Sequence, residues 1–198
     1  MPSNESYDEY VEHPRFGRSP NYTGLNPETD FGGDTFIHWH SPKSCRVANT
    51  AIEADLSKQT PATVPVSHYY DVKRKCRDCE KMFLFFAAEQ KYWYEELGFG
   101  LDSDCVRCVW CRGKQNELSK LRKEYEDLRS NENRSTSETL KLAEYCMQLI
   151  EKKILSIKSA QRVRQLLNSI ESEPSIQDEI DRIRISLTRI ENESRQKQ

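Results

Sequence analysis

Two Cys-x-x-Cys pairs constrain this chain more than any other feature. Cys76-Arg77-Asp78-Cys79 and Cys108-Val109-Trp110-Cys111 are separated by 28 residues. Two residues between paired cysteines allow both sulfurs to face one ion, and four thiolates in a closed tetrahedron are typical of structural zinc. Five of the seven cysteines lie in this short stretch, which favours a metal site in a reducing compartment over a disulfide framework. We therefore expect one structural Zn²⁺ bound by Cys76, Cys79, Cys108 and Cys111.

Two further groups of residues offer alternative metal chemistry. Cys105 lies three residues before Cys108, so it could be an alternative ligand or a thiol with a redox role, but we favour the interpretation as a small side chain in a loop. A second metal site is conceivable at His38, His40, Cys45 and His68, because His38 and His40 would share one face of a strand.

The spacer between the cysteine pairs predicts a strand followed by a helix. Residues 82–86 are apolar and aromatic, and residues 87–97 have helical spacing, with Phe86, Gln90, Trp93 and Leu97 along one face. Gly98 suits the left-handed residue that ends a helix, and Phe99 follows where a Schellman motif makes its hydrophobic contact. We expect the aromatic face of this unit to cover the metal site.

The same segment contains a series of short motifs in a fixed order: Cys76-Arg77-Asp78-Cys79, Phe83-Leu84-Phe85, Glu89-Gln90, Trp93-Tyr94, Gly98-Phe99 and Arg107-Cys108-Val109-Trp110-Cys111-Arg112. In this order, residues 70–114 resemble the probable zinc-ribbon domain family, which is found mostly in bacterial proteins of unknown function. The resemblance implies zinc binding and no settled activity. Glu80 departs from the family, which usually has glycine there, and Cys105 is an additional thiol. Without glycine, the turn after the first pair has less freedom to adopt a positive φ.

The remainder of the chain divides into three regions. Residues 1–33, with scattered prolines and no apolar periodicity, predict a loosely ordered, flexible arm. Residues 34–71 predict short strands packing on the ribbon at 72–114. Residues 115–198 predict helices at about 115–130, 136–155, 159–172 and 175–194. The fold class is therefore α+β, with a C-terminal helical bundle. The alternative to the bundle is a coiled-coil dimer through Ile176, Ile180, Ile183, Leu187 and Ile190.

Basic side chains flank both cysteine pairs. Lys73, Arg74 and Arg77, together with Trp93 and Trp110, form a candidate interaction surface for nucleic acid. The net charge is only −2 and no segment has a large positive excess, so compensation of the zinc–thiolate charge explains these cations as well. A second basic stretch, residues 152–164, contains no acidic residue. It is either a docking surface or a solvated helix face.

The sequence contains no recognisable catalytic motif, such as a glycine-rich phosphate loop, Gly-x-Ser-x-Gly or His-Glu-x-x-His. We therefore expect a protein that is not an enzyme and that binds another protein. The alternatives are a nucleic-acid-binding protein and a redox-responsive regulator acting through Cys105. The start of the sequence lacks a signal-peptide pattern, and no apolar run is long enough to cross a bilayer. These observations predict a cytoplasmic protein without membrane contact, either a monomer or a coiled-coil dimer.

Overall fold

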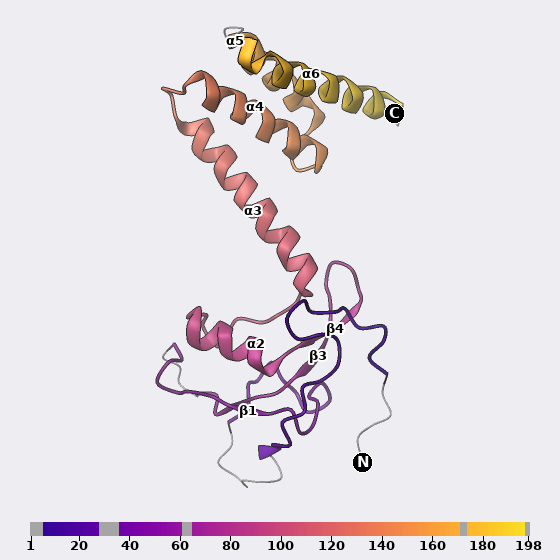
Figure 1. Ribbon diagram of the computed structural model, residues 1–198, viewed down its shortest axis with the longest axis vertical. Helices are drawn as coiled ribbons and strands as arrows, with labels where there is room; N and C mark the ends of the chain where they lie inside the picture. Colours follow the sequence, from indigo (N-terminus) through magenta and orange to yellow (C-terminus); the bar gives the residue numbers. More distant parts are fainter. Residues whose placement is uncertain (1–5, 28–35, 61–64, 171–173, 197–198) are drawn as a thin grey trace. The chain divides into compact units, whose positions relative to one another are not determined.

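The computed structural model describes residues 6–27, 36–60, 65–170 and 174–196. The chain forms two compact units, Met1–Gly113 and Lys114–Gln198. The first unit contains short strands and a helical segment, and the second is helical (Figure 1). The protein is thus of the α+β class, and its cysteine pairs both lie in the first unit.

Two small antiparallel sheets organise the first unit. β1 (Ile52–Glu53) pairs with β2 (His68–Tyr69), and β3 (Val72–Lys75) pairs with β4 (Met82–Phe85). Alternate side chains of a strand point to opposite sides. Since all four residues of β4 are apolar, the strand is apolar on both faces. Phe83 and Phe85 pack with the cysteines, whereas Leu84 and the following Phe86 join a separate cluster. The hairpin therefore has a hydrophobic layer on each side.

The N-terminal segment supplies one of these layers. Tyr7 packs with Leu84 and Phe86, and the backbone N–H of Val11 donates to the carbonyl of Met82 at 2.8 Å. Residues 6–27 are therefore not the loose arm that their composition predicts, while residues 1–5 and 28–33 lie outside the described part of the chain. Isolated aromatic residues without periodicity give no local signal of order, although here Tyr7 and Phe16 pack onto a surface made elsewhere in the sequence.

The buried carboxylate of Asp71 joins three parts of this unit. It accepts hydrogen bonds from the backbone N–H of Ala87 and of Asn21, both at 2.7 Å. Ala87 is the first residue of α2 (Ala87–Lys91), whose own N-cap Phe86 makes no side-chain cap. Asp71 thus caps this helix from a distant part of the sequence, at the end where a negative charge is favourable.

The helix in the spacer changes its pitch half-way. α2 is followed by η2 (Tyr92–Glu96), a π-helix, and the N–H of Leu97 bonds to the carbonyl of Tyr92. Gly98 has a φ of +67°, as its position predicts, and Phe99 contacts Trp93 edge-on at 5.3 Å. The wider turn alters the order of side chains around the helix. Leu97 is consequently 46% exposed and does not lie on the buried face that 3.6-residue spacing predicts.

The second unit is built around α4 (Thr136–Glu151), whose capping box joins Ser135 and Glu138 as the sequence predicts. α3 (Val109–Ser130) precedes it; η3 (Ile157–Ser159), α5 (Ala160–Ser169) and α6 (Pro174–Arg195) follow. α3 begins six residues before the expected position. The sequence predicted a later start because Gly113, a residue that disfavours helix, lies inside α3. α4 ends before residue 155, since Lys153 adopts a left-handed φ of +57°.

The apolar seam of α6 is buried within the chain. Ile180, Ile183 and Leu187 are each less than 8% exposed and pack in one core with residues of α4 and α5. The same seam was the basis for expecting a coiled-coil dimer, and it is used here for packing inside the bundle. Cys146 lies in this core and is fully buried.

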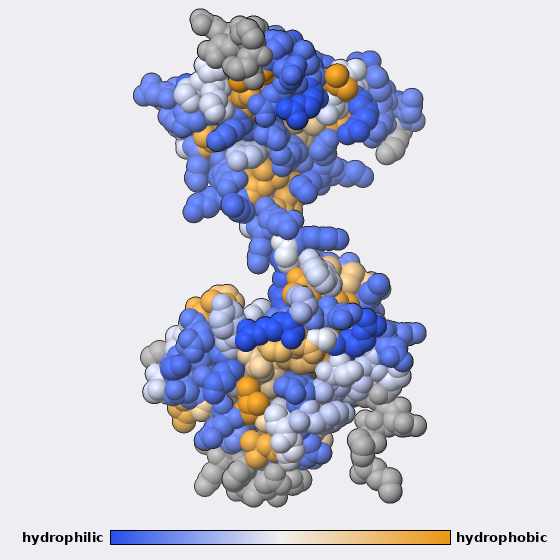
Figure 2. Space-filling model, viewed as in Figure 1, coloured by the Kyte–Doolittle hydropathy of each residue, from blue (hydrophilic) through white to orange (hydrophobic). Residues whose placement is uncertain are grey.

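The surface in the view of Figure 2 is mainly hydrophilic, with separate hydrophobic patches. Within the described residues, none of the helices combines the length and the apolar character that a bilayer crossing requires.

Candidate metal centre

Four cysteine sulfurs converge at one end of the β3–β4 hairpin. The sulfurs of Cys76, Cys79, Cys108 and Cys111 all lie within 4.8 Å of one another. In the part of the chain that the structure describes, this is the one cluster of three or more side chains that could bind a metal ion. The sulfurs of Cys79 and Cys108 are 3.8 Å apart. A zinc ion bound to four sulfurs at about 2.3 Å requires sulfur–sulfur distances of about 3.8 Å in a tetrahedron. The cluster is therefore consistent with one bound metal ion, and its four thiolate donors fit zinc.

The first cysteine pair lies in the turn that joins β3 to β4. The N–H of Cys76 donates to the carbonyl of Lys81, and the N–H of Glu80 donates to the carbonyl of Cys76. Glu80 adopts a φ of +61°. The turn thus requires the left-handed conformation that glycine adopts without steric cost, and glutamate adopts it here at some expense.

The second pair lies at the start of α3. Cys108 immediately precedes the helix, Cys111 lies in its first turn, and the N–H of Arg112 donates to the carbonyl of Cys108. The positive end of the helix dipole therefore faces the cluster, where it favours thiolates.

The electrostatics of the cluster favour ionised sulfur at one cysteine in particular. Burial alone raises the pKa of Cys76, but its sulfur accepts hydrogen bonds from three backbone N–H groups, and the pKa falls to about 6. Burial and the three neighbouring sulfurs raise the pKa of Cys111 to about 12. A divalent cation at the centre of the four sulfurs would relieve this mutual repulsion.

An ion pair connects the two cysteine pairs. The Nε–H of Arg107 donates to both carboxylate oxygens of Asp78, at 3.0 and 2.9 Å. One partner lies between the first two cysteines and the other directly before the second pair. The sequence motifs around the two pairs are therefore complementary in charge.

A second arginine near the cluster is more deeply buried. Arg112 forms an ion pair with Glu89, contacts the sulfur of Cys105 and lies over the ring of Trp93 at 5.0 Å. His13 approaches the same carboxylate at 3.5 Å. Burial raises the pKa of Glu89, and the charge of Arg112 opposes this increase. This network connects α2, the start of α3 and the N-terminal segment.

These observations describe a turn and a helix that each present two cysteines to one centre. Residues 70–120 match a family described as a probable treble clef domain. The matching family is described as a treble clef and not as the zinc ribbon expected from the sequence, and the second pair lies at the start of a helix. The match covers the β3–β4 hairpin, the spacer and the first part of α3. A search of curated proteins and a search of solved structures each found no match.

Cys105 lies outside the four-cysteine cluster. Its side chain is buried, and burial raises the pKa of its thiol to about 12 despite the nearby charge of Arg112. A thiol of this kind is poorly ionised and poorly accessible, the opposite of what a reactive cysteine requires.

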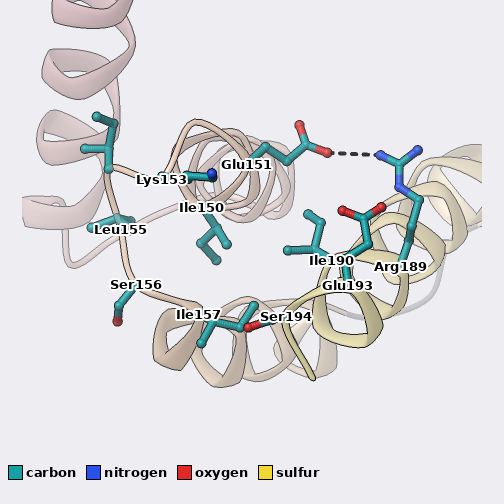
Figure 3. A pocket seen from close by; sticks show the side chains of 11 residues that line it. Ile150, Glu151, Lys153, Leu155, Ser156, Ile157, Arg189, Ile190, Glu193 and Ser194 are labelled. Atoms are coloured by element: carbon teal, nitrogen blue, oxygen red, sulfur yellow. Dashed lines mark hydrogen bonds and ion pairs between the residues drawn. The ribbon is translucent and has the colours of Figure 1, made fainter. Parts of the chain in front are cut away.

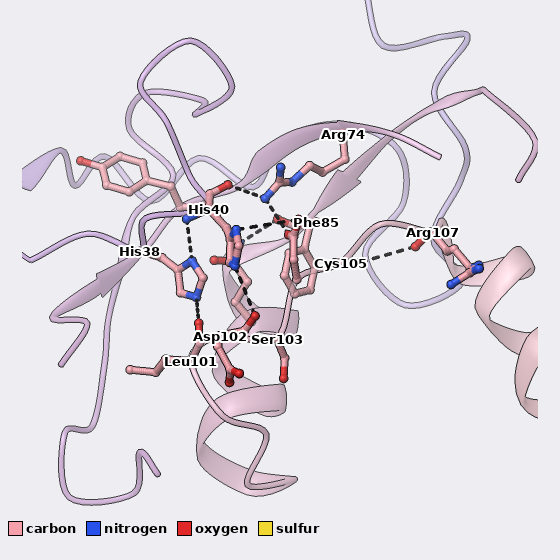
Figure 4. Close-up of polar contacts among 12 residues, drawn as sticks. His38, His40, Arg74, Phe85, Leu101, Asp102, Ser103, Cys105 and Arg107 are labelled. Atoms are coloured by element: carbon pink, nitrogen blue, oxygen red, sulfur yellow. Dashed lines mark hydrogen bonds and ion pairs between the residues drawn. The ribbon is translucent and has the colours of Figure 1, made fainter. Parts of the chain in front are cut away.

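Ring nitrogens of His38 and His40 form hydrogen bonds within the fold (Figure 4). Nε2 of His38 bonds to the carbonyl of Leu101 at 2.6 Å, and Nδ1 accepts the N–H of His40 at 3.1 Å. Burial lowers the pKa of His38 to about 4. Within the described residues, the geometry does not gather His38, His40, Cys45 and His68 into a metal cluster. The spacing was suggestive, but both nitrogens of His38 are used in hydrogen bonds.

The residues of the candidate interaction surface have different environments. Arg74 pairs with Asp104 at 2.8 Å, Lys73 is half-buried, and Arg77 is exposed. Trp93 packs between Phe85, Phe99 and Arg112. Trp110 is 57% exposed, although its indole N–H donates to the carbonyl of Glu12. The five residues therefore do not form one continuous exposed basic surface.

Sequence reasoning missed the roles of Glu89, His13 and Asp71. The motif Glu89-Gln90 was visible, but nothing local indicated that Glu89 would meet Arg112. The amide of Gln90 donates to the carbonyls of Tyr70 and Phe85, at 2.6 and 2.9 Å, and ties α2 to the strands.

Proposed function

We propose that this protein is non-enzymatic, that one structural zinc ion organises its treble clef segment, and that it functions by binding another protein. The observation that carries the proposal is the closed set of four cysteine sulfurs around one centre. Four protein ligands complete a zinc tetrahedron, so no position remains for the water or substrate that catalytic zinc requires.

Zinc would hold the β3–β4 turn to the start of α3, in addition to the ion pair between Arg107 and Asp78. β3 and β4 are only four residues each, so their hairpin is small. A small domain of this kind obtains much of its folding free energy from metal binding. Phe83 and Phe85 pack against the cysteines and exclude water from one side of the site.

The two other candidate functions receive less support. Binding of nucleic acid depends on unpaired cations, yet Arg74, Arg107 and Arg112 each contact a carboxylate of this chain. A redox role for Cys105 requires an accessible thiolate, and its thiol is buried with a raised pKa. Several large apolar side chains are exposed, among them Tyr92, Phe99 and Trp110, and such residues are frequent in protein interfaces.

Metal content separates the ligand assignment from its alternative. We expect one zinc ion per chain in the wild type and in Cys105→Ser, and a loss of zinc in Cys108→Ser. Cobalt substitution should give the visible absorption of a tetrahedral thiolate site in the first two proteins only. Zinc retained by Cys108→Ser but lost by Cys105→Ser would overturn the assignment. An exchangeable water on the bound cobalt would argue against the closed site.

A further inference from the structure

The helical unit contains a groove of about 900 Å³ between the end of α4, η3 and the last part of α6 (Figure 3). Among the charged residues that line this groove, Lys153 and Arg189 balance Glu151 and Glu193. The groove therefore favours neither an acidic nor a basic partner. The contacts of the N-terminal segment with the metal centre are more specific.

Three consecutive residues of the N-terminal segment each contact a different element near the four cysteines. The backbone N–H of Val11 donates to the carbonyl of the first residue of β4 at 2.8 Å. The carbonyl of Glu12 accepts the indole N–H of Trp110, in the first turn of α3, at 3.1 Å. Nε2 of His13 lies 3.5 Å from the carboxylate of Glu89, in α2. We call these three consecutive residues the clasp.

The clasp joins the two parts of the first unit that carry the cysteine pairs. β4 begins directly after the turn that contains the first pair, and Trp110 lies between Cys108 and Cys111. Val11 also packs against a hydrophobic cluster that contains one cysteine of each pair. The second pair is thereby connected to the β3–β4 hairpin through the N-terminal segment.

The loop that follows the clasp fixes its shape. The backbones of His13 and Gly17 exchange two hydrogen bonds of 2.8 Å, and Nδ1 of His13 accepts two further N–H groups of the loop, at 3.1 and 3.3 Å. Phe16 packs against the ring of Phe86, with the ring centroids 5.2 Å apart. A loop of this length is not stable without the surface on which it packs, so the loop and the clasp should form together.

We propose that the clasp fastens the second cysteine pair to the β3–β4 hairpin, so that it must open before the two pairs can separate and release a bound metal ion. This inference rests on the zinc site proposed above. Cys79 is exposed, so the centre is not sealed from solvent. The restraint is geometric, because sulfurs that are held close together rebind the ion before it can diffuse away. Trp110 is thus a positioning residue that acts through the cysteines on either side of it.

Gly17→Ala tests the proposal in the full-length, zinc-loaded protein without altering a residue next to a cysteine. Gly17 has a φ of +77°, and an added Cβ would meet no atom within 4 Å, so the variant strains only the backbone of the loop. Amide hydrogen exchange of Val11 measures opening of the clasp, because this N–H is bonded across to β4. Transfer of zinc to a chromogenic chelator in excess measures separation of the pairs. The left-handed strain, less the entropy that alanine removes from the open loop, should raise both rates about threefold.

The chain offers a matched control for this variant. Gly24 has a φ of +84°, and an added Cβ would again meet no atom within 4 Å, but this residue lies outside the clasp and its loop. Gly24→Ala should therefore leave both rates unchanged. The amide of Gln90, bonded in the first turn of α2, serves as an internal control, since a general opening of the first unit would speed its exchange as well. Trp110→Phe deletes the indole donor and keeps an aromatic ring, and it should also raise both rates about threefold.

Faster exchange of Val11 in Gly17→Ala without faster release of zinc would overturn the proposal, because the clasp would then open without loosening the metal centre. Equal increases at Val11 and Gln90, faster zinc release in Gly24→Ala, or an unchanged Val11 rate in both Gly17→Ala and Trp110→Phe would overturn it as well. Zinc content of the wild type is measured first. A wild type that binds no zinc contradicts the proposed zinc site itself, whereas zinc that is bound and then released at one rate by all variants contradicts the clasp alone.

Discussion

Arg107 and Arg112 flank the same cysteine pair, and the structure predicts very different consequences for their removal. We consider the variants Arg107→Met and Arg112→Met, which keep an unbranched side chain and delete the charge. The Arg112–Glu89 pair is largely buried, with side-chain exposures of 18% and 9%. The Arg107–Asp78 pair is more open, at 27% and 38%. Both pairs are ionic, so their difference in burial should decide the outcome.

The expected magnitudes follow from the group that each substitution leaves behind. Removing Arg112 leaves the carboxylate of Glu89 buried, and breaking such a pair typically costs about 3–5 kcal/mol. His13, at 3.5 Å from the same carboxylate, can supply part of the missing charge. We therefore expect a loss of about 3 kcal/mol. Removing Arg107 leaves Asp78 partly in water, where such pairs contribute less than about 1 kcal/mol.

Urea unfolding followed by tryptophan fluorescence measures both effects. All three tryptophans, Trp39, Trp93 and Trp110, belong to the first compact unit, so the signal reports on the unit that contains both arginines. The free zinc concentration must be equal in all samples, because zinc binding adds to the measured stability.

A double-mutant cycle with Glu89→Gln tests whether the loss belongs to the pair. We expect a coupling energy between Glu89 and Arg112 of at least about 1 kcal/mol. Similar losses for the two arginine variants, or a negligible coupling, would refute the argument that burial decides the contribution of each pair.

Three further predictions concern single residues. Glu80→Gly should raise the free energy of unfolding by about 0.5 kcal/mol, because relief of the left-handed strain slightly exceeds the entropy that glycine adds to the unfolded chain. Glu80→Ala should show no such gain in the same urea assay. An equal gain for the two variants would contradict this explanation. Burial raises the pKa of Asp71 to about 6, above its unfolded value near 4, so its contribution to stability is largest below about pH 4 and is lost as the pH rises to about 6. The stability of the wild type relative to Asp71→Asn should accordingly fall by about 3 kcal/mol over this interval, and a difference independent of pH would contradict the assignment. Ser135→Ala should lower the free energy of unfolding by about 1 kcal/mol, measured by circular dichroism, because it removes the cap of α4. Ser137→Ala, at an exposed position, should lower it by less than about 0.5 kcal/mol. Equal losses for the two variants would count against the capping box.

Elements specified by local chemistry were predictable from the sequence. Residues 82–86 predicted a strand, and β4 occupies Met82–Phe85. The pattern Ser135-x-x-Glu138 predicted the start of α4, because a capping box is a hydrogen-bonded unit within a few residues. Gly98 was predicted to be left-handed for the same reason, since the end of a helix depends on the residue that follows it.

Elements that depend on distant partners were not predictable in this way. Residues 6–27 have no periodicity, and their order arises from contacts with β4 and Asp71. The apolar seam of α6 is equally compatible with a dimer and with a bundle, because periodicity identifies a buried face but not the surface that buries it. The 3.6-residue spacing predicted that Leu97 lies on the buried face, but the π-helical turn η2 leaves it exposed. A helical spacing rule assumes a constant pitch, which this helix does not have.

The candidate metal site shows the same division. The sequence alone determined that two cysteine pairs are available for one ion, because two intervening residues hold paired sulfurs close together wherever the chain goes. The sequence favoured Cys108 and Cys111 over Cys105, and in the tertiary structure these two cysteines meet the first pair at the start of α3. The choice depends on the direction in which the chain enters the helix. Arg112, in the first turn of that helix, pairs with Glu89 and lies over Trp93, and no short stretch of sequence encodes these contacts.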